Sequence, residues 1–488
     1  MPFIVAKLAG PKSATVFLED LPPEEIAKVK EPSGLVNLGN TCYLNSVIQS
    51  LRSVPQLRKG ITSYSPSPNT HQHATSFGGN PAVNGPFLMA LRDTFNALDR
   101  TANAIPPAAL VRTTKMAFPQ FAQLGPQGQP MQQDAEEFYS GLLTIAAGET
   151  KGKDKIEKGL DVVTEEELNG ADNLIDAIFG LKMEETLTCD EFDVDNKMEV
   201  DGEAAPAAIA ALVEPPVKSF DLLRKLVCNI QGGSDGSSQV NVGHISEGIA
   251  LSLNGKIEKH SDVLGRNAIW TRKQRIARLP PIIVVQFGRF YWKATPDSQD
   301  HNGVKCKVMK PVAFNSTLDV YEFCTEAVQK VLKVSRDKAL AEDEARIEKK
   351  LKGRSEDTKM EEAKNGDEET SGAADEDEEL QKALAMSVEE TPPPVGPGLP
   401  TNFQGVYELF AVVTHKGRDA DGGHYMAWVK AESNRGKVQK IADTDEQNED
   451  WYVFDDDEVS PCKTEDVLKL KGGGDWHMSY LNFYRAKK

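Results

Sequence analysis

The strongest constraint on the fold of this 488-residue chain is a change in hydrophobic periodicity along its length. Apolar residues in the first third recur at helical spacing, which predicts amphipathic helices over 44–52, 86–100 and 131–145. Later segments are typical of short β-strands separated by turns rich in Gly and Asn. The strand candidates are 181–189, 220–231, 282–287, 409–413, 425–429 and 451–454. Helices followed by strands favour an α+β architecture.

Composition excludes several classes of function. Hydrophobic residues make up 39% of the chain, enough for a sizeable core, so disorder throughout is excluded. The formal net charge of -18 disfavours binding to nucleic acid or to an anionic membrane, because both carry negative charge. No segment approaches the roughly 18–20 apolar residues that span a bilayer, and residues 1–20 lack the order of a signal peptide. We therefore expect a soluble protein of the cytoplasm, with the nucleus as a second location.

The cysteines are scattered, and none belongs to a Cys-x-x-Cys pair. They are Cys42, Cys189, Cys228, Cys306, Cys324 and Cys462. This pattern disfavours both a disulfide framework and a four-cysteine zinc site. Without further context each cysteine is best interpreted as a small buried hydrophobic residue.

Cys42 has a context that changes this interpretation. The Gly- and Asn-rich stretch 34–41 runs directly into the predicted helix 44–52. The positive end of a helix stabilises a thiolate and presents backbone N–H groups beside it. The segment therefore indicates a nucleophilic cysteine, although a structural thiol at a helix start explains it equally well.

Two residues near the end of the chain fit the same chemistry. Gly422 and Gly423 precede His424, which is the first residue of an apolar strand, and Asp455 follows the strand 451–454. The Asp455 carboxylate could hold the imidazole through Nδ1 and leave Nε2 facing a thiol, as in cysteine hydrolases. Each residue also has an ordinary interpretation, a polar strand end for His424 and a solvated turn for Asp455.

Taken together, these segments resemble the ubiquitin-specific protease family of cysteine deubiquitinases. The matching segments, in the order of the family, are GLVNLGNTCYLNSVIQSL (34–51), QQDAEEF (132–138), GGHYMAWVK (422–430), WYVFDDDEV (451–459) and SYLNFYR (479–485). The resemblance covers about residues 34–488. It implies an α+β fold of the papain-like cysteine protease superfamily, with thumb, palm and fingers. An extended linker (1–33) would precede a catalytic domain in two parts, 34–352 and 401–488, with a long helix near 325–352.

Carried over by motif, the roles of the family fall on individual residues of this chain. Cys42 would be the nucleophile, His424 the general base and then acid, and Asp455 the residue that orients the imidazole. Asn37 would stabilise the oxyanion through its side-chain amide, together with the Cys42 backbone N–H. Asp134, expected on a helix, would pair with an arginine of the ubiquitin tail; without the resemblance it is an ordinary surface carboxylate. The resemblance implies neither a metal nor an organic cofactor.

Residues 353–400 differ in kind, with 14 acidic and 4 basic residues, and we expect a solvated, flexible insert there. Within it, 376–390 resembles a ubiquitin-interacting motif, in which an acidic run precedes one apolar helical face. That face would bind ubiquitin through Leu380, Ala383, Leu384 and Ser387. The ordinary alternative is a transient helix in a linker.

A finer resemblance points to the proteasome-associated branch of the family. It rests on RSVPQL (52–57), MAFPQFA (116–122) and GGGDWH (472–477). That branch docks on the proteasome through an N-terminal ubiquitin-like domain, which the 33 residues in front of the catalytic domain are too few to form. By the same resemblance, segments 290–305 and 416–423 would be two loops over the channel for the ubiquitin tail, and Phe290 would contact ubiquitin. Ordinary surface hairpins explain the two segments equally well.

The sequence thus predicts a thiol-dependent deubiquitinase that hydrolyses the isopeptide bond after the C-terminal Gly of ubiquitin and trims ubiquitin from proteasome-bound substrates. Its expected partners are ubiquitin, polyubiquitin conjugates and the 26S proteasome. Two alternatives stay open, namely a non-catalytic ubiquitin-binding regulator of the proteasome and a general papain-like peptidase. The intact Cys, His and Asp segments favour the enzyme over the regulator.

Overall fold

The computed structural model describes most of the chain, in separate stretches. These are residues 32–66, 81–101, 103–161, 163–191, 214–231, 241–293, 304–359, 395–418, 422–431, 450–474 and 476–487. Contacts divide the chain into two compact units, Met1–Glu149 with Ala411–Leu470, and Thr150–Phe410 with Lys471–Lys488. Within the described stretches, no helix combines the length and apolar character that a membrane crossing requires.

The first unit contains the helices of the first third of the chain. They are α2 (Cys42–Arg52), α3 (Pro55–Thr62), α4 (Pro81–Arg100), α5 (Ala108–Ala117), the 3-10 turn η3 (Pro119–Ala122) and α6 (Ala135–Glu149). α2 is enclosed on all sides, since every one of its residues is buried. It packs against α3 and α6. A helix this enclosed places its first residue, Cys42, at a fixed point.

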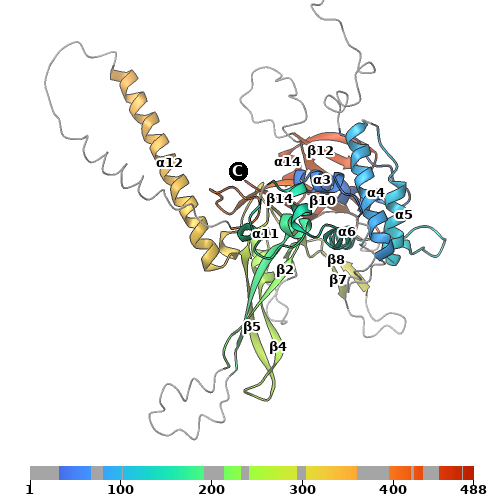
Figure 1. Cartoon of the computed structure of the whole chain (residues 1–488), viewed down its shortest axis with the longest axis horizontal. Helices are drawn as coiled ribbons and strands as arrows, with labels where there is room; N and C mark the ends of the chain where they lie inside the picture. Colours follow the sequence, from blue (N-terminus) through green and yellow to red (C-terminus); the bar gives the residue numbers. More distant parts are fainter. Residues whose placement is uncertain are drawn as a thin grey trace, which may run out of the picture. The chain divides into compact units, whose positions relative to one another are not determined.

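Strands from the last part of the chain complete the first unit. β10 (Val406–Lys416) runs into this unit from the second one and is followed by β11 (His424–Lys430), β12 (Asp450–Asp455) and β13 (Glu458–Lys463). Each strand is antiparallel to the next, and α14 (Thr464–Leu468) follows β13. α2 packs on β11 and β12, so segments about 400 residues apart in sequence lie side by side (Figure 1).

The second unit contains a four-stranded antiparallel sheet in the order β2-β1-β5-β4. Its strands are β1 (Leu181–Cys189), β2 (Val217–Leu223), β4 (Asn254–Ser261) and β5 (Arg266–Arg278). β4 and β5 form a long hairpin (Figure 1). Trp270 is fully buried and packs with Leu187, Cys189 and Ala268 in a cluster of its own, which stabilises the sheet away from the main core.

The remaining strands of the second unit surround a buried central strand. β6 (Ile282–Phe287) lies between the antiparallel β14 (Met478–Ala486) and the parallel β3 (Leu226–Cys228). β7 (Phe290–Lys293) pairs with β8 (Val304–Lys307), and β9 (Thr317–Asp319) pairs with the start of β10. The helical elements are α7 (Lys153–Gly159), α8 (Glu165–Leu168), α9 (Leu174–Phe179), α11 (Ile245–Leu253), η5 (Tyr321–Phe323) and the 34-residue α12 (Glu326–Lys359).

The α+β expectation is confirmed, while several predicted boundaries differ. The helix predicted over 131–145 is found at 135–149, because Asp134 begins it. The single strand predicted over 220–231 is two strands, β2 and β3, separated by a bend at 224–225. The long helix predicted to end at 352 continues to Lys359. Residues 360–394, which include the ubiquitin-interacting segment 376–390, lie outside the described residues.

Candidate active site

The turn in front of α2 is fixed by the β12–β13 turn. Leu35 N–H donates to the Asp456 carbonyl (2.8 Å). A Cβ added to Gly34 would lie 2.5 Å from the Asp457 carbonyl oxygen, so only glycine allows this approach. The turn closes at Asn40, whose φ of 52 is one that asparagine tolerates, and α2 follows after the N-cap residue Thr41. Cys42 therefore stands at the N-terminus of a buried helix, as the sequence predicts.

The opposite side of the site is built by the turn that leads into β11. Gly423 has a φ of 118, and a Cβ there would lie 2.2 Å from the Lys416 carbonyl and 2.6 Å from the His415 ring. The buried His415 ring contacts the Gly422 carbonyl through Nε2 at 3.0 Å. Together these contacts fix the direction in which His424 leaves the strand.

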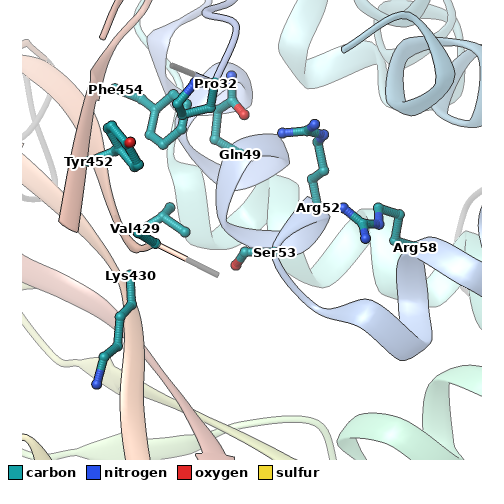
Figure 2. Close-up of a pocket in the computed structure, with 10 residues that line it drawn as sticks. Pro32, Gln49, Arg52, Ser53, Arg58, Val429, Lys430, Tyr452 and Phe454 are labelled. Carbon is teal, nitrogen blue, oxygen red and sulfur yellow. The ribbon is translucent and has the colours of Figure 1, made fainter. Parts of the chain in front are cut away.

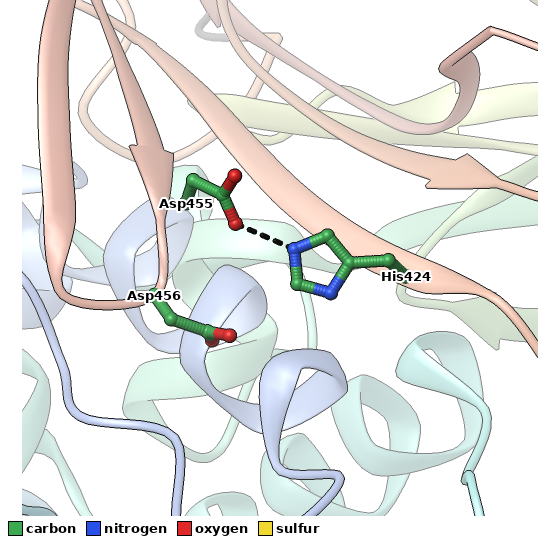
Figure 3. A group of neighbouring side chains, drawn as sticks. All are labelled: His424, Asp455 and Asp456. Atoms are coloured by element: carbon green, nitrogen blue, oxygen red, sulfur yellow. Dashed lines mark hydrogen bonds and ion pairs between the residues drawn. The ribbon is translucent and has the colours of Figure 1, made fainter.

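His424 lies between Cys42 and Asp455. Its Nε2 is 2.5 Å from Asp455 Oδ1 (Figure 3), and its side chain is also hydrogen bonded to that of Cys42. The sequence analysis expected Asp455 to bond Nδ1 of the imidazole, and this was wrong, because Asp455 is hydrogen bonded to Nε2. Nδ1 is thus the nitrogen left for the sulfur. The structure does bring together the thiol, the imidazole and the carboxylate that the sequence singled out.

The charge of His424 follows from these contacts. Its hydrogen bond with Cys42, supported by Asp455 and opposed by partial burial, raises the pKa of His424 from 6.5 to about 9. The imidazole is therefore protonated at neutral pH. An imidazolium beside a cysteine sulfur is the arrangement in which cysteine hydrolases hold a thiolate nucleophile.

Other cysteines lie in surroundings that suppress thiolate formation. Burial raises the pKa of Cys228 and of Cys462 to about 12. Burial also raises the pKa of Cys324, which is 2% exposed. These thiols stay protonated at neutral pH and are structural, as the sequence-based interpretation held for isolated cysteines.

Asp456 is a site residue that the sequence reasoning missed. Its Oδ2 accepts from the Asn37 amide and its Oδ1 from the Asn45 amide, both at 2.8 Å. The Asn37 oxygen accepts in turn from the backbone N–H groups of Gly39 (2.9 Å) and Thr41 (3.2 Å). The Asn37 carboxamide therefore has one defined orientation beside Cys42. The run Asp455–Asp457 was the signal for this, but the sequence does not say which carboxylate faces which partner.

Gln132 was also missed, although its segment was quoted. Its Nε2 lies 3.1 Å from Cys42 Sγ, which makes it the second side chain, beside that of His424, in contact with Cys42. Gln132 precedes α6 and reaches the start of α2. A glutamine in a polar run carries no sign of this contact in the sequence.

His424, Asp455 and Asp456 place three ligand atoms within 4.8 Å of one another, a spacing that a metal ion could use (Figure 3). Each group already has a partner, since Asp455 bonds the imidazole and Asp456 accepts two amides. A metal would compete with these hydrogen bonds for the same groups. Among the described residues this is the single such cluster, and its chemistry fits the hydrolase site better than a metal centre.

The residues expected to contact ubiquitin lie in different parts of the chain. Asp134 was predicted to lie on a helix, but it directly precedes α6. Its side chain accepts a hydrogen bond from the Glu136 N–H (2.8 Å), in the manner of an N-cap. Phe290 lies in the second unit, where its ring packs edge-on against Tyr480 at 5.1 Å. Its contact with ubiquitin stays a prediction. Leu380, Ala383, Leu384 and Ser387 lie outside the described residues.

A small cavity of about 40 Å³ lies at the other end of α2. Gln49, Arg52 and Ser53 line it from α2 and the residue after it, with side chains of β11 and β12 opposite (Figure 2). The buried Gln49 Oε1 has no hydrogen-bond partner among the described residues. The volume suits one or a few water molecules and is too small for an organic ligand.

The fold and this site define a cysteine hydrolase of the papain-like type, with a thiol at a helix start and an imidazole held by a carboxylate. The family description "Ubiquitin carboxyl-terminal hydrolase" matches residues 33–484. The chain therefore belongs to the ubiquitin carboxyl-terminal hydrolase family, and it is a cysteine-type ubiquitin hydrolase. This confirms the predicted fold class and the predicted type of enzyme.

Individual relatives span almost the whole chain. It is similar to ubiquitin carboxyl-terminal hydrolase 6 of Arabidopsis thaliana, with 33% identity over 98% of this chain and 83% of the relative. Ubiquitin carboxyl-terminal hydrolase 6 of Schizosaccharomyces pombe is 30% identical over 96% and 81%. Ubiquitin carboxyl-terminal hydrolase 14 of Caenorhabditis elegans is 27% identical over 98% and 78%.

Proposed function

We propose that the protein removes ubiquitin from conjugates by attack of Cys42 on the C-terminal glycine carbonyl of ubiquitin. The contact chain Cys42–His424–Asp455 carries this proposal, because it joins a nucleophile, a proton carrier and an orienting carboxylate. Burial raises the pKa of the Cys228 and Cys462 thiols instead, which disfavours their thiolates.

The reaction has two halves. The Cys42 thiolate adds to the carbonyl carbon, and the His424 imidazolium gives its proton to the lysine ε-amine that leaves, which produces a thioester with ubiquitin. The imidazole, now neutral, takes a proton from water as the water attacks the thioester. Ubiquitin leaves with a free carboxylate, and the thiolate and imidazolium are restored. Asp455 stabilises the charged imidazole in both halves through Nε2.

Asn37 is the proposed donor to the oxyanion, together with the Cys42 backbone N–H. An amide nitrogen carries two hydrogens, and the bond to Asp456 uses one of them. The first backbone N–H groups of a helix have no acceptor within it, so that of Cys42 can serve the substrate. Both donors are fixed before the substrate arrives, which is the condition for efficient transition-state stabilisation.

The proteasome is the proposed place of action, and the cytoplasm and nucleus the proposed locations. The support is the likeness of residues 52–57, 116–122 and 472–477 to the proteasome-associated branch. Purified 26S proteasome should co-sediment with the full chain and increase its rate of ubiquitin hydrolysis. If micromolar proteasome neither bound the chain nor changed its rate, this part of the proposal would be wrong while the hydrolase activity would stand.

The role of Cys42 is tested by hydrolysis of a fluorogenic ubiquitin C-terminal amide. Cys42→Ala should abolish hydrolysis and retain ubiquitin binding in calorimetry. Cys462→Ala is the matched control, since this partly exposed thiol has its pKa raised by burial. It should keep wild-type activity. A Cys42→Ala protein that still hydrolyses ubiquitin would overturn the proposal.

A further inference from the structure

A second polar side chain reaches the proposed nucleophile from the segment that precedes α6. Gln132 Nε2 lies 3.1 Å from Cys42 Sγ, and Gln132 is half-buried. The amide nitrogen of glutamine is a donor only, so the sulfur is the acceptor in this contact. We infer that Gln132 is a further catalytic residue, which donates a hydrogen bond to the Cys42 sulfur and stabilises the thiolate. This inference rests on the proposed role of Cys42.

The distance between the two residues is fixed by an aromatic cluster under the site. Tyr43, next to Cys42 on α2, stacks on Phe121 at 5.4 Å and meets Phe138 of α6 edge-on at 5.7 Å. All three rings are buried. Such contacts between large rings restrict relative motion of the elements that carry them. α2 and α6 are thereby held together close to the sulfur.

The chain on either side of Gln132 is tied down as well. On one side, the Asn40 amide donates to the Pro130 carbonyl at 2.7 Å, which links the turn before α2 to the segment before α6. On the other, Asp134 caps α6. The buried Tyr425 of β11 bonds the Ala135 backbone. The segment that carries Gln132 is thus tied to the turn before α2, which leads to Cys42, and to β11, which carries His424.

A donor in this position acts on the charge of the sulfur. A thiolate has no hydrogen and several lone pairs, so it can accept from the His424 imidazolium and from the Gln132 amide together. Hydrogen bonds to an ionised group are about twice as strong as neutral ones. Loss of the amide therefore destabilises the thiolate more than the neutral thiol, and the pH needed to form the thiolate rises.

Gln133 provides a matched control on the same segment. Its Nε2 bonds the Met131 carbonyl at 3.4 Å and not the sulfur. Gln133→Ala and Gln132→Ala remove the same atoms from neighbouring positions. Gln132→Glu keeps the shape of the side chain but replaces the donor by a carboxylate, which repels a thiolate.

The test is the pH dependence of Cys42 alkylation by iodoacetamide in the full-length protein without ubiquitin, followed by mass spectrometry of the Cys42 peptide. In Gln132→Ala the acid limb of the profile should move up by about one pH unit, as expected for one lost hydrogen bond to an anion. Gln132→Glu should move it further. Gln133→Ala should match the wild type. On the plateau above the acid limb, the Gln132→Ala and wild-type rates should converge.

Three results would overturn the inference. The first is an acid limb that does not move in either Gln132 variant, and the second is an equal shift of the limb in Gln133→Ala. The third is an alkylation rate that falls by the same factor at every pH in Gln132→Ala, which would indicate a merely structural role. Circular dichroism and ubiquitin binding verify that each variant is folded. Because alkylation requires no hydrolysis of ubiquitin, failure here leaves the proposed function to its own test.

Discussion

The carboxylate of Asp456 accepts a hydrogen bond from the side-chain amide of Asn37, with a donor–acceptor distance of 2.8 Å. This bond crosses from the β12–β13 turn to the turn before α2, and the same carboxylate holds Asn45. It sets the orientation of the proposed oxyanion donor without contacting the sulfur. Asp456 is therefore a positioning residue, adjacent in sequence to Asp455, which bonds the imidazole.

Asp456→Ala should lower kcat by about 10²- to 10³-fold, the effect of losing one oxyanion donor, with ubiquitin affinity nearly unchanged. Asp457→Ala is the control, because Asp457 is the exposed neighbour and should change kcat by no more than about twofold. The measurement is steady-state hydrolysis of a fluorogenic ubiquitin amide. Equal kcat values for the two variants would contradict the assignment.

The pH dependence of hydrolysis should have an alkaline limb with an apparent pKa near 9, the value to which Cys42 and Asp455 raise the pKa of His424. The pKa of His424 is higher in the folded than in the unfolded protein. The stabilising interactions of the imidazolium are therefore fully present below pH 6.5 and are lost as the pH rises through about 9. Asp455→Asn removes one of the raising contacts and should move this limb to lower pH. An unmoved limb in that variant would show that another group titrates.

Gly423→Ala should reduce kcat by about 10²-fold, because an added Cβ meets the Lys416 carbonyl and the His415 ring and displaces His424. Gly474→Ala serves as the control, since a Cβ there meets nothing within 4 Å. Steady-state kinetics of both variants, with thermal unfolding to verify the fold, test this. Wild-type kcat in Gly423→Ala would mean that the turn does not position the imidazole.

Arg289 should make a large contribution to stability. It is fully buried and donates to the carbonyls of Ser479, Val308, Lys310 and Lys471. Arg289→Ala leaves these acceptors unsatisfied and should lower the free energy of unfolding by about 3–5 kcal/mol. Arg266 is exposed and paired with Glu191, so Arg266→Ala should lower the free energy of unfolding by no more than about 1 kcal/mol. Urea unfolding of both variants compares them, and similar losses would contradict this account.

The catalytic residues Cys42, His424 and Asp455 were predicted from the order of several family-like segments, because the helix or strand end at which each one lies has an ordinary interpretation as well. The sequence could not predict which ring nitrogen of His424 faces Asp455. That depends on the side-chain torsions and on the offset between β11 and β12. Gln132 and Asp456 were missed for a similar reason, since their partners lie about 90 and 420 residues away in the chain.

Some strands of the fold were likewise predicted from the sequence, and others were missed. Strands β1 and β6 were predicted at their observed bounds, 181–189 and 282–287. β5 was missed because charged residues interrupt it, although the burial of Ala268 and Trp270 on alternate positions is the period of a strand. The break between β2 and β3 contains Arg224, which forms an ion pair with Asp176, 48 residues away in the sequence. Such long-range contacts leave no local pattern.

The most direct test of the central claim is covalent capture by ubiquitin with a C-terminal electrophile, followed by intact-mass and peptide analysis. We predict one ubiquitin adduct, located on Cys42, and no adduct in Cys42→Ala. The capture rate should fall by about 10²-fold or more in His424→Ala, because the general acid and base is lost. An adduct on another cysteine, or capture by His424→Ala at the wild-type rate, would contradict the account.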